Sequence, residues 1–159
     1  MNKKLRVGWF SFSCCEDSTI VFTELLNDHW NEWKDKIEFV NALILQKRGE
    51  LKDLDISFVE GAIASEAQEQ KLKEIRQNSK KVVAIGACAC TGMPSAQRNS
   101  FNDEQKKEID NILIRFQYAQ RVKKLKDVIT VDAQVNGCPM VESVFLETLA
   151  TCLQEFGLQ

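Results

Sequence analysis

Residues 80–90 have the sequence KKVVAIGACAC. The four consecutive apolar residues from Val82 to Ile85 are typical of a strand that is buried on both faces of a parallel sheet. Gly86 ends this run, and Cys88 and Cys90 follow it directly. In an open parallel sheet, ligands bind beyond the carboxyl ends of the strands. The stretch therefore predicts a buried parallel strand with a cysteine-bearing site at its end.

Strand-like and helix-like segments alternate along the rest of the chain. We expect strands at residues 4–10, 37–45, 55–60, 80–85 and 128–131. We expect helices at residues 19–33, 65–77, 102–126 and 140–156, with Ser65 as an N-cap and Gly157 at the end of the last helix. This alternation predicts an α/β fold, a flavodoxin-like doubly wound parallel sheet. No repeat or linker interrupts it, so residues 1–159 are expected to form a single domain.

The composition favours an ordinary globular protein, with 44% hydrophobic and 28% charged residues and a formal net charge of −2. No basic stripe with interleaved aromatic residues is present, which argues against nucleic acid as a partner. The sequence has neither a signal-peptide pattern nor an apolar run long enough to span a membrane, and we expect a cytoplasmic protein. In that compartment the six cysteines are expected to stay reduced and to bind metal or take part in redox chemistry.

Five of the six cysteines fall at three places, each just after an expected strand. They are Cys14-Cys15, Cys88-Ala89-Cys90, and Cys138 within Asn136-Gly137-Cys138-Pro139. The topology of a parallel sheet should bring these places to one edge. Iron–sulfur clusters take thiolate ligands, commonly four, and glycines beside them allow close backbone approach.

Two other interpretations of cysteines apply to this chain. Cys152 lies on the apolar face of the last expected helix and is expected to be a core residue. Zinc sites usually show Cys-x₂₋₄-Cys pairs, which neither Cys14-Cys15 nor Cys88-x-Cys90 provides. The three cysteine-bearing places therefore favour an iron–sulfur cluster over zinc.

Four motifs in order along nearly the whole chain resemble the small subunit of cytoplasmic [NiFe] hydrogenases and the related cluster-bearing subunit of respiratory complex I. The motifs are Val7-Gly8-Trp9-Phe10 followed by Cys15; Val59-Glu60-Gly61-Ala62-Ile63; Gly86-Ala87-Cys88-Ala89-Cys90-Thr91-Gly92 with Pro94 and Arg98-Asn99; and Val131-Asp132 with Gly137-Cys138-Pro139.

The resemblance to the short soluble forms implies a flavodoxin-like domain that carries one proximal [4Fe-4S] cluster and transfers electrons without performing catalysis itself. It implies docking against a hydrogenase large subunit that holds the nickel–iron site, and further flavin or iron–sulfur electron-transfer subunits. It also implies that longer relatives continue with a segment for further clusters. Cys15, Cys88 and Cys138 are the implied ligands, with Cys14 as the fourth and Cys90 in reserve.

One departure from the hydrogenase pattern keeps two alternatives open. Hydrogenases usually begin with Cys-x-x-Cys, and here Phe12 occupies the first of these positions, while Cys14 and Cys15 are adjacent as in complex I. A complex-I-like electron-transfer subunit without hydrogenase activity is one alternative. A flavodoxin-like assembly module without a cluster is the other.

Polar residues near these motifs allow two roles each. Glu16 and Asp17 follow the cysteine pair, where each is expected either to relay protons or contact the partner subunit, or to begin a helix. Asp17 fits the first turn of a helix, where an acid complements the dipole, and both roles stay open for Glu16. Glu60 is expected either at a partner interface or in a loop hydrogen bond. Arg98 is expected either to pair with a partner carboxylate or to brace its own loop.

Overall fold

Six strands form one sheet in the order β3-β2-β1-β4-β5-β6. The computed structural model describes residues 4–158. The parallel strands are β1 (Leu5–Ser11), β2 (Ile37–Ala42), β4 (Leu54–Glu60), β5 (Ser79–Ile85) and β6 (Ala133–Val135), and β3 (Lys47–Arg48) pairs antiparallel with β2 at one edge. The α-helices are α1 (Asp17–Trp33), α2 (Glu66–Gln77), α3 (Gly86–Thr91), α4 (Asp103–Arg115) and α5 (Glu142–Glu155).

The strand order confirms the expected fold class. Counted in chain order, the five parallel strands are arranged 2-1-3-4-5, which is the flavodoxin-like order with its switch point between the first and third strands. These two strands are β1 and β4, so loops that follow them diverge to opposite faces and leave room for a site at their carboxyl ends.

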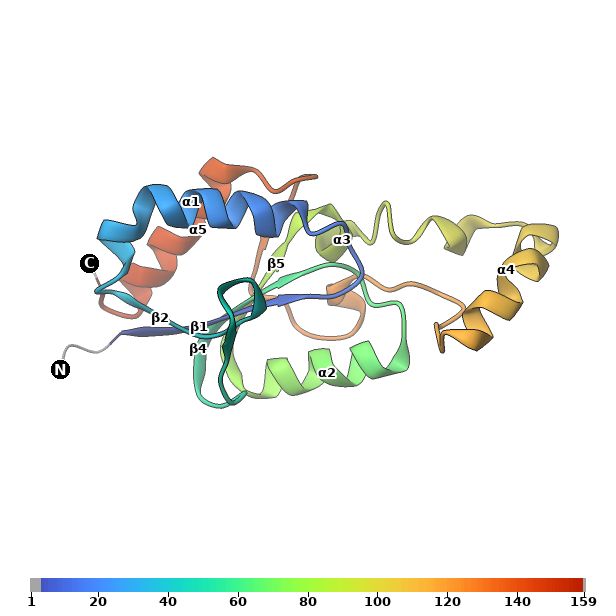
Figure 1. Cartoon of the computed structure of the whole chain (residues 1–159), viewed down its shortest axis with the longest axis horizontal. Helices are drawn as coiled ribbons and strands as arrows, with labels where there is room; N and C mark the ends of the chain where they lie inside the picture. Colours follow the sequence, from blue (N-terminus) through green and yellow to red (C-terminus); the bar gives the residue numbers. More distant parts are fainter. Residues whose placement is uncertain (1–3, 159) are drawn as a thin grey trace.

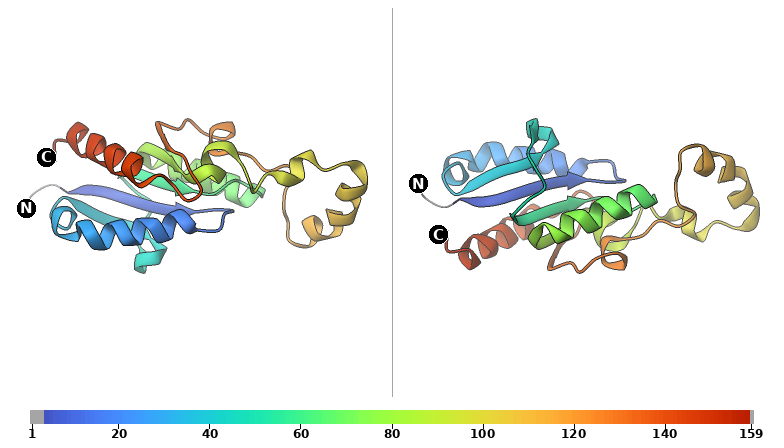
Figure 2. Two further views of the ribbon diagram at one scale, coloured as in Figure 1. Left: turned by 90° about the horizontal axis from the view of Figure 1, so that it is seen from above. Right: turned by 90° about the horizontal axis from the view of Figure 1, so that it is seen from below.

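Helices cover both faces of the sheet (Figure 1, Figure 2). On the face covered by α1 and α5, aromatic side chains form the centre of the core, and the Trp9 and Phe22 rings stack at a centroid distance of 4.1 Å. Phe58 and Phe145 contact the same cluster. On the other face, α2 contributes Leu72 to a second core of aliphatic residues.

Helix ends follow the sequence signals where these are strong. The Ser65 hydroxyl accepts a hydrogen bond from the Gln68 N–H, which confirms the expected N-cap of α2. Asp17 is the first residue of α1. Gly157 has φ 72° just after α5, and the following N–H of Leu158 donates to the carbonyl of Leu153, as in a Schellman motif.

The expected strand at residues 128–131 is wrong, and β6 lies at Ala133–Val135 instead. Val128, Ile129 and Val131 pack as partly buried side chains against the α2-side core, so their apolar character reflects packing rather than strand pairing. Asp132 directly precedes β6, and its carboxylate accepts a hydrogen bond from the N–H of Val82 in β5.

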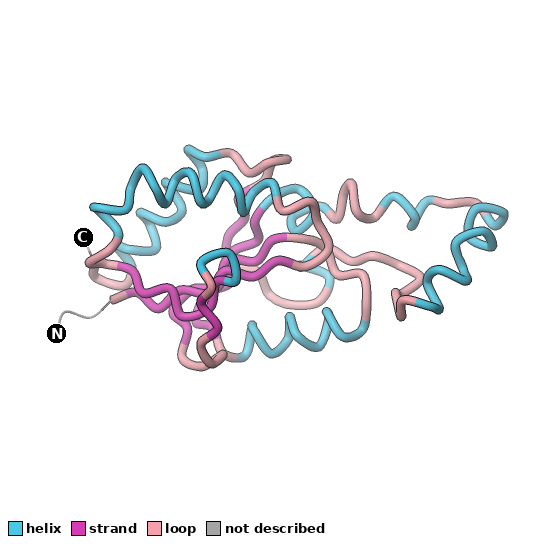
Figure 3. Tube along the Cα trace, in the orientation of Figure 1, coloured by secondary structure: helices cyan, strands magenta, loops and turns pink. Residues whose placement is uncertain are grey.

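The expected helix at residues 102–126 is also too long, because α4 ends at Arg115. Gln117 adopts φ 56°, and the N–H of Tyr118 returns to the carbonyl of Leu113, which closes a Schellman motif without a glycine. We call residues 92–124 the arm. It projects beyond the carboxyl end of the sheet, and loops join α4 to the rest of the chain (Figure 1, Figure 3).

Two shorter differences concern the strands that flank the site. The expected strand at 37–45 ends at Ala42, and Leu43–Leu45 form a 3₁₀ turn, η1. The cysteines that follow β5 lie on the short helix α3 rather than in an open loop.

No helix within residues 4–158 has the length and apolar character needed to cross a bilayer.

Candidate functional site

Four cysteines from three segments line one narrow pocket at the carboxyl end of the sheet. Cys14 and Cys15 follow β1, Cys88 lies on α3 after β5, and Cys138 follows β6. Glu60, the last residue of β4, lines the same pocket. The cavity between these side chains is small, about 10 Å³. The convergence expected from the parallel topology is present.

Two glycines allow the cysteine-bearing segments to approach. Gly86 has φ 79°, and a Cβ there would lie 2.9 Å from the Ser18 Oγ. Gly137 has φ 122°, and a Cβ there would lie 2.4 Å from the carbonyl oxygen of Pro139. A side chain is disfavoured at both positions, because φ is positive and because a Cβ atom would be too close to neighbouring atoms. Each glycine comes one or two residues before a pocket cysteine.

Hydrogen bonds join the segments around the pocket. The N–H of Ala87 on α3 donates to the carbonyl of Gly137 at 2.7 Å. The Ser18 hydroxyl on α1 accepts the N–H of Met140 at 3.2 Å. These hydrogen bonds between protein groups hold the segments after β1, β5 and β6 together.

Cys88 and Cys90 point in different directions because they lie two residues apart on a helix, and residues at that spacing do not share a face. Cys88 lines the pocket, and its sulfur accepts a hydrogen bond from the Ser95 hydroxyl at 3.3 Å. The Cys90 sulfur lies 3.6 Å from the carbonyl oxygen of Ala84, within the α2-side core. Burial raises the pKa of the Cys90 thiol to about 11.

The pocket thiols lie close enough to affect one another's ionisation. Burial, followed by the nearby Glu60 carboxylate, raises the pKa of the Cys14 thiol to about 12, and Cys88 adds to this effect. At Cys15 the N–H of Asp17 favours the thiolate and lowers the pKa. Burial, the Asp17 carboxylate and Cys138 act in the opposite direction and together raise the pKa of the Cys15 thiol. Both thiols are therefore protonated at neutral pH.

Glu60 is a buried carboxylate, with 3% of its surface exposed. Its two oxygens accept hydrogen bonds from the N–H of Ser18 at 3.1 Å and from the Thr19 hydroxyl at 2.6 Å, both on α1. Burial raises its pKa, although these hydrogen bonds act in the opposite direction. Of the two roles considered for Glu60, the hydrogen bond is present, and it connects β4 to the start of α1.

Comparisons with known proteins identify the family of this chain. Residues 14–152 match the family described as the 20 kDa subunit of NADH ubiquinone oxidoreductase. The chain belongs to this family. The matched range contains all four pocket cysteines.

Curated proteins with related sequences include hydrogenase subunits from Methanothermobacter and Methanocaldococcus. A subunit of the F420-non-reducing hydrogenase of Methanothermobacter marburgensis is 30% identical, over 97% of this chain and 55% of its own length. A subunit of the vhu F420-non-reducing hydrogenase of Methanocaldococcus jannaschii is 29% identical, over 94% of this chain and 56% of its own length. The chain thus spans about half the length of these relatives.

Solved structures share the fold. A chain of an NAD⁺-reducing [NiFe]-hydrogenase in the H₂-reduced state superposes with a TM-score of 0.80 at 20% identity, covering 96% of this chain and 93% of that one. A chain of the Ni-Fe-Se hydrogenase from Desulfomicrobium baculatum gives a TM-score of 0.67 at 17% identity, covering 93% of this chain and 61% of that one. At these identities the likeness concerns the fold alone.

Other polar and cysteine residues of this member of the 20 kDa subunit family have structural roles. Arg98 donates to the carbonyl oxygen of Ala119, within the arm, at 2.7 Å and to that of Ala64, before α2, at 3.3 Å, so it braces the arm and joins it to the segment after β4. Cys152 is buried in the α1/α5-side core with Leu149, as expected.

Sequence reasoning missed the two serines, Ser18 and Ser95, that contact the site. Their hydroxyls bond the N–H of Met140 and the sulfur of Cys88. A single serine belongs to no recognisable sequence motif. The one available signal was that Ser18 lies in the first turn after the cysteine pair, at this edge of the sheet.

Proposed function

We propose that this chain is the electron-transferring small subunit of a [NiFe]-hydrogenase-like complex and holds one proximal [4Fe-4S] cluster on Cys14, Cys15, Cys88 and Cys138. The observation that carries the proposal is the convergence of these four thiols, from three segments, on one pocket at the carboxyl end of the sheet. Cys90 is not one of the proposed ligands, because its sulfur faces the core.

The donor set fits an iron–sulfur cluster better than a single metal ion. All four candidate ligands are thiols, which is the ligand type of [4Fe-4S] clusters. Among residues 4–158, no three Cys, His, Asp or Glu side chains converge tightly enough to hold one metal ion. A single zinc ion requires such convergence, since every ligand contacts the same atom. In a four-iron cluster each cysteine binds a different iron, so the thiols lie further apart.

The residues of the pocket would hold and tune the cofactor. When bound, the cluster would supply a one-electron carrier. The cysteines would bind it as thiolates, so these thiols, whose pKa values are raised, would give up their protons on binding. The Ser95 hydroxyl remains positioned to donate to the Cys88 sulfur, and such hydrogen bonds tune cluster potentials. The chain itself performs no bond chemistry.

The sequence relatives support a hydrogenase context. Two relatives that cover nearly the whole chain are named as hydrogenase subunits. We therefore propose a large subunit with a nickel–iron site as the partner, with further flavin or iron–sulfur subunits as electron partners, in the cytoplasm.

A complex-I-like electron-transfer subunit without hydrogenase activity is the second candidate. The adjacent pair Cys14-Cys15 favours it, and so does the description of the matching family as a subunit of NADH ubiquinone oxidoreductase. The two candidates share the cluster and differ in whether the partner contains nickel.

Single Cys→Ser variants test the ligand set. After anaerobic purification, Cys14→Ser, Cys15→Ser, Cys88→Ser and Cys138→Ser are each expected to lose or weaken the broad visible absorbance and the bound iron and sulfide. Cys90→Ser and Cys152→Ser are the matched controls and should keep both. A colourless wild-type chain without iron would contradict the cluster and favour the assembly-module alternative. Loss of colour in Cys90→Ser with retention in Cys14→Ser would reassign the fourth ligand.

Metal analysis of the intact complex separates the two candidates. A tag on this chain allows the complex to be purified anaerobically from its native host, and nickel, iron and acid-labile sulfide are then measured. Nickel together with iron and sulfide supports the hydrogenase proposal. Iron and sulfide without nickel supports the complex-I-like candidate.

A further inference from the structure

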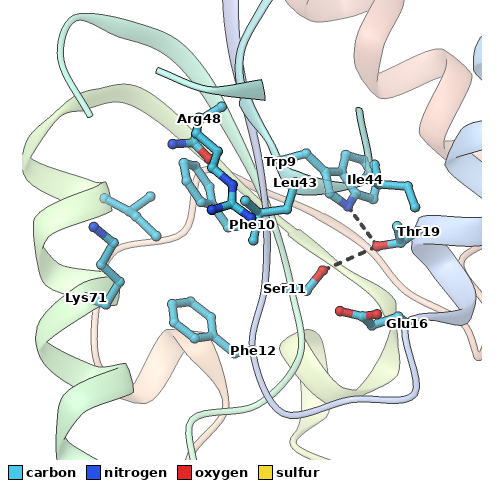
Figure 4. A pocket seen from close by; sticks show the side chains of 12 residues that line it. Trp9, Phe10, Ser11, Phe12, Glu16, Thr19, Leu43, Ile44, Arg48 and Lys71 are labelled. Carbon is cyan, nitrogen blue, oxygen red and sulfur yellow. Dashed lines mark hydrogen bonds between the residues drawn. The ribbon is translucent and has the colours of Figure 1, made fainter. Parts of the chain in front are cut away.

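A second and larger pocket lies beside the end of β1, outside the cysteine site. Its cavity volume is about 490 Å³, within the range of about 300–1,000 Å³ that is usual for small-molecule sites. It forms because β1 continues to Ser11, whereas β2 ends at Ala42, opposite Trp9, and the chain then turns into η1. Figure 4 shows the side chains that surround this space.

One wall of the pocket is apolar and partly aromatic. It is formed by Phe10, Phe12, Leu43, Ile44 and Ile75. Leu43 and Ile44, on η1, are 65% and 51% exposed, so apolar surface borders an open cavity. Aromatic faces and branched aliphatic side chains of this kind suit a flat apolar group.

Two cations flank the apolar wall. Arg48 comes from β3 and Lys71 from α2, and both lie in the part of the cavity away from Glu16 (Figure 4). Within residues 4–158, no carboxylate lies within salt-bridge distance of the Arg48 guanidinium. The Lys71 ammonium lies 2.8 Å from Glu74, in an exposed pair of the kind that contributes little stability. Both cations are therefore available to an anionic group.

The remaining charge on the lining is Glu16, which lies beside Thr19 and away from Arg48 and Lys71 (Figure 4). The positive charge is thus concentrated at one end of the cavity. Arginine is well suited to carboxylate, phosphate or sulfonate groups, which its planar guanidinium can bind through two hydrogen bonds.

We propose that this pocket binds a small organic anion that has a flat apolar body, with its charged group at Arg48 and Lys71 and its body against Phe10, Phe12 and Leu43. Thr19 lines this pocket and donates a hydrogen bond to Glu60, which lines the cysteine pocket. The bound molecule therefore lies one side chain away from the cysteine site. The proposal does not depend on whether the cysteines hold a cluster.

Two fluorescent probes that differ only by a sulfonate test the proposal on the full chain. They are 8-anilinonaphthalene-1-sulfonate and the uncharged N-phenyl-1-naphthylamine. We expect saturable binding of one equivalent, with the sulfonate probe binding more tightly. The double variant Arg48→Gln/Lys71→Gln should weaken the sulfonate probe about tenfold or more, since hydrogen bonds to charged groups are lost. Its affinity for the uncharged probe should stay within about twofold, since only the contacts to the sulfonate are removed.

The control variant Lys107→Gln removes an exposed lysine of α4, far from the pocket lining, and should bind both probes like the wild type. Two results would overturn the proposal. One is a double variant that binds the sulfonate probe as tightly as the wild type. The other is binding that disappears on Phe116→Ser, which would place the probe on the apolar surface of the arm instead.

Discussion

The sheet and the arm are held together in opposite ways. Every residue of β4 is buried, whereas only Leu113 of α4 is buried. On the arm, Ile112, Ile114, Phe116 and Tyr118 are exposed. Local signals shape α4, namely the capping box of Asn102 and Gln105 and the Schellman turn at Gln117. Backbone hydrogen bonds from Ala119 and Lys123 tie the arm to the segment after β4. The comparison indicates that the sheet supplies most of the free energy of unfolding, and that α4 contributes little to it.

The largest expected effect comes from removing an aromatic ring from the sheet core. Phe58→Ala is expected to lower the free energy of unfolding by about 3–5 kcal/mol, because it leaves a cavity beside Trp9 and Phe145. Phe116→Ala, at a 59% exposed position of the arm, should change it by less than about 0.5 kcal/mol. Urea unfolding followed by fluorescence measures both. Equal losses would mean that the arm is part of the cooperative core.

A smaller effect is expected where the sheet meets the cysteine site. Gly86→Ala combines a positive φ with a contact of 2.9 Å to the Ser18 Oγ, and should cost about 2–3 kcal/mol. Gly157→Ala is the matched control, since its φ is also positive but no atom lies within 4 Å, and backbone strain alone should cost about 1 kcal/mol. The difference between the two unfolding free energies isolates the packing contribution. Equal free energies of unfolding for the two variants would mean that the contact with the Ser18 Oγ does not destabilise the Gly86→Ala protein.

Asp132 should make the free energy of unfolding depend on pH. Burial opposes its ionisation, but the Val82 N–H and the Arg76 guanidinium outweigh it and hold the pKa of Asp132 below its ordinary value. A lowered folded-state pKa stabilises the protein above the unfolded-state pKa of about 3.9, and this contribution is lost as the pH falls further.

Asp132→Asn should therefore cost about 1 kcal/mol at pH 7 and progressively less below about pH 4. Asp103→Asn, whose side chain is 97% exposed on the arm, should cost less than about 0.5 kcal/mol at either pH. Chemical unfolding at several pH values provides the measurement. A cost for Asp132→Asn that stays constant from about pH 7 to about pH 3 would argue against the shifted pKa.

The smallest global effect should come from a contact within the arm that joins its incoming and outgoing segments. Asn99 exchanges two hydrogen bonds with Val122, at 2.7 and 2.8 Å. Asn99→Ala should leave the thermal midpoint of the sheet almost unchanged but increase amide hydrogen exchange in α4 by about tenfold, because local opening no longer breaks these bonds. Asn31→Ala on the exposed side of α1 is the control. Uniformly faster exchange throughout the sheet would contradict the separation of the two regions.

The sheet was predictable because its signals are redundant. The continuous apolar run in β5 predicted a buried parallel strand, and the alternation of elements placed the cysteine-bearing segments at one edge. The arm was less predictable because its determinants are not distinctive in sequence. Gln117, just after α4, adopts a left-handed conformation that usually requires glycine. Outside the arm, the apolar residues at 128–131 were also misleading, because they serve packing rather than strand pairing.

The candidate site was predictable only in part for a similar reason. The positions of Cys14, Cys15, Cys88 and Cys138 follow from topology. The orientation of Cys90 depends on α3 being helical, and six residues rich in alanine, cysteine and glycine carry no periodic signal. The hydroxyl of Ser95 reaches Cys88 from the arm through tertiary contacts that no local pattern encodes.

The spacing of the pocket cysteines along the chain determines when, relative to translation, a group bound by all four can be inserted. The first, Cys14, and the last, Cys138, are separated by 138 − 14 = 124 positions, and the pocket also requires β6 to pair with β5. A nascent chain that has emerged only as far as α4 contains three of the four thiols, but not the strand that positions the fourth. Any group bound by all four must therefore be inserted after translation has passed β6, and the delivery machinery must act on a nearly finished sheet.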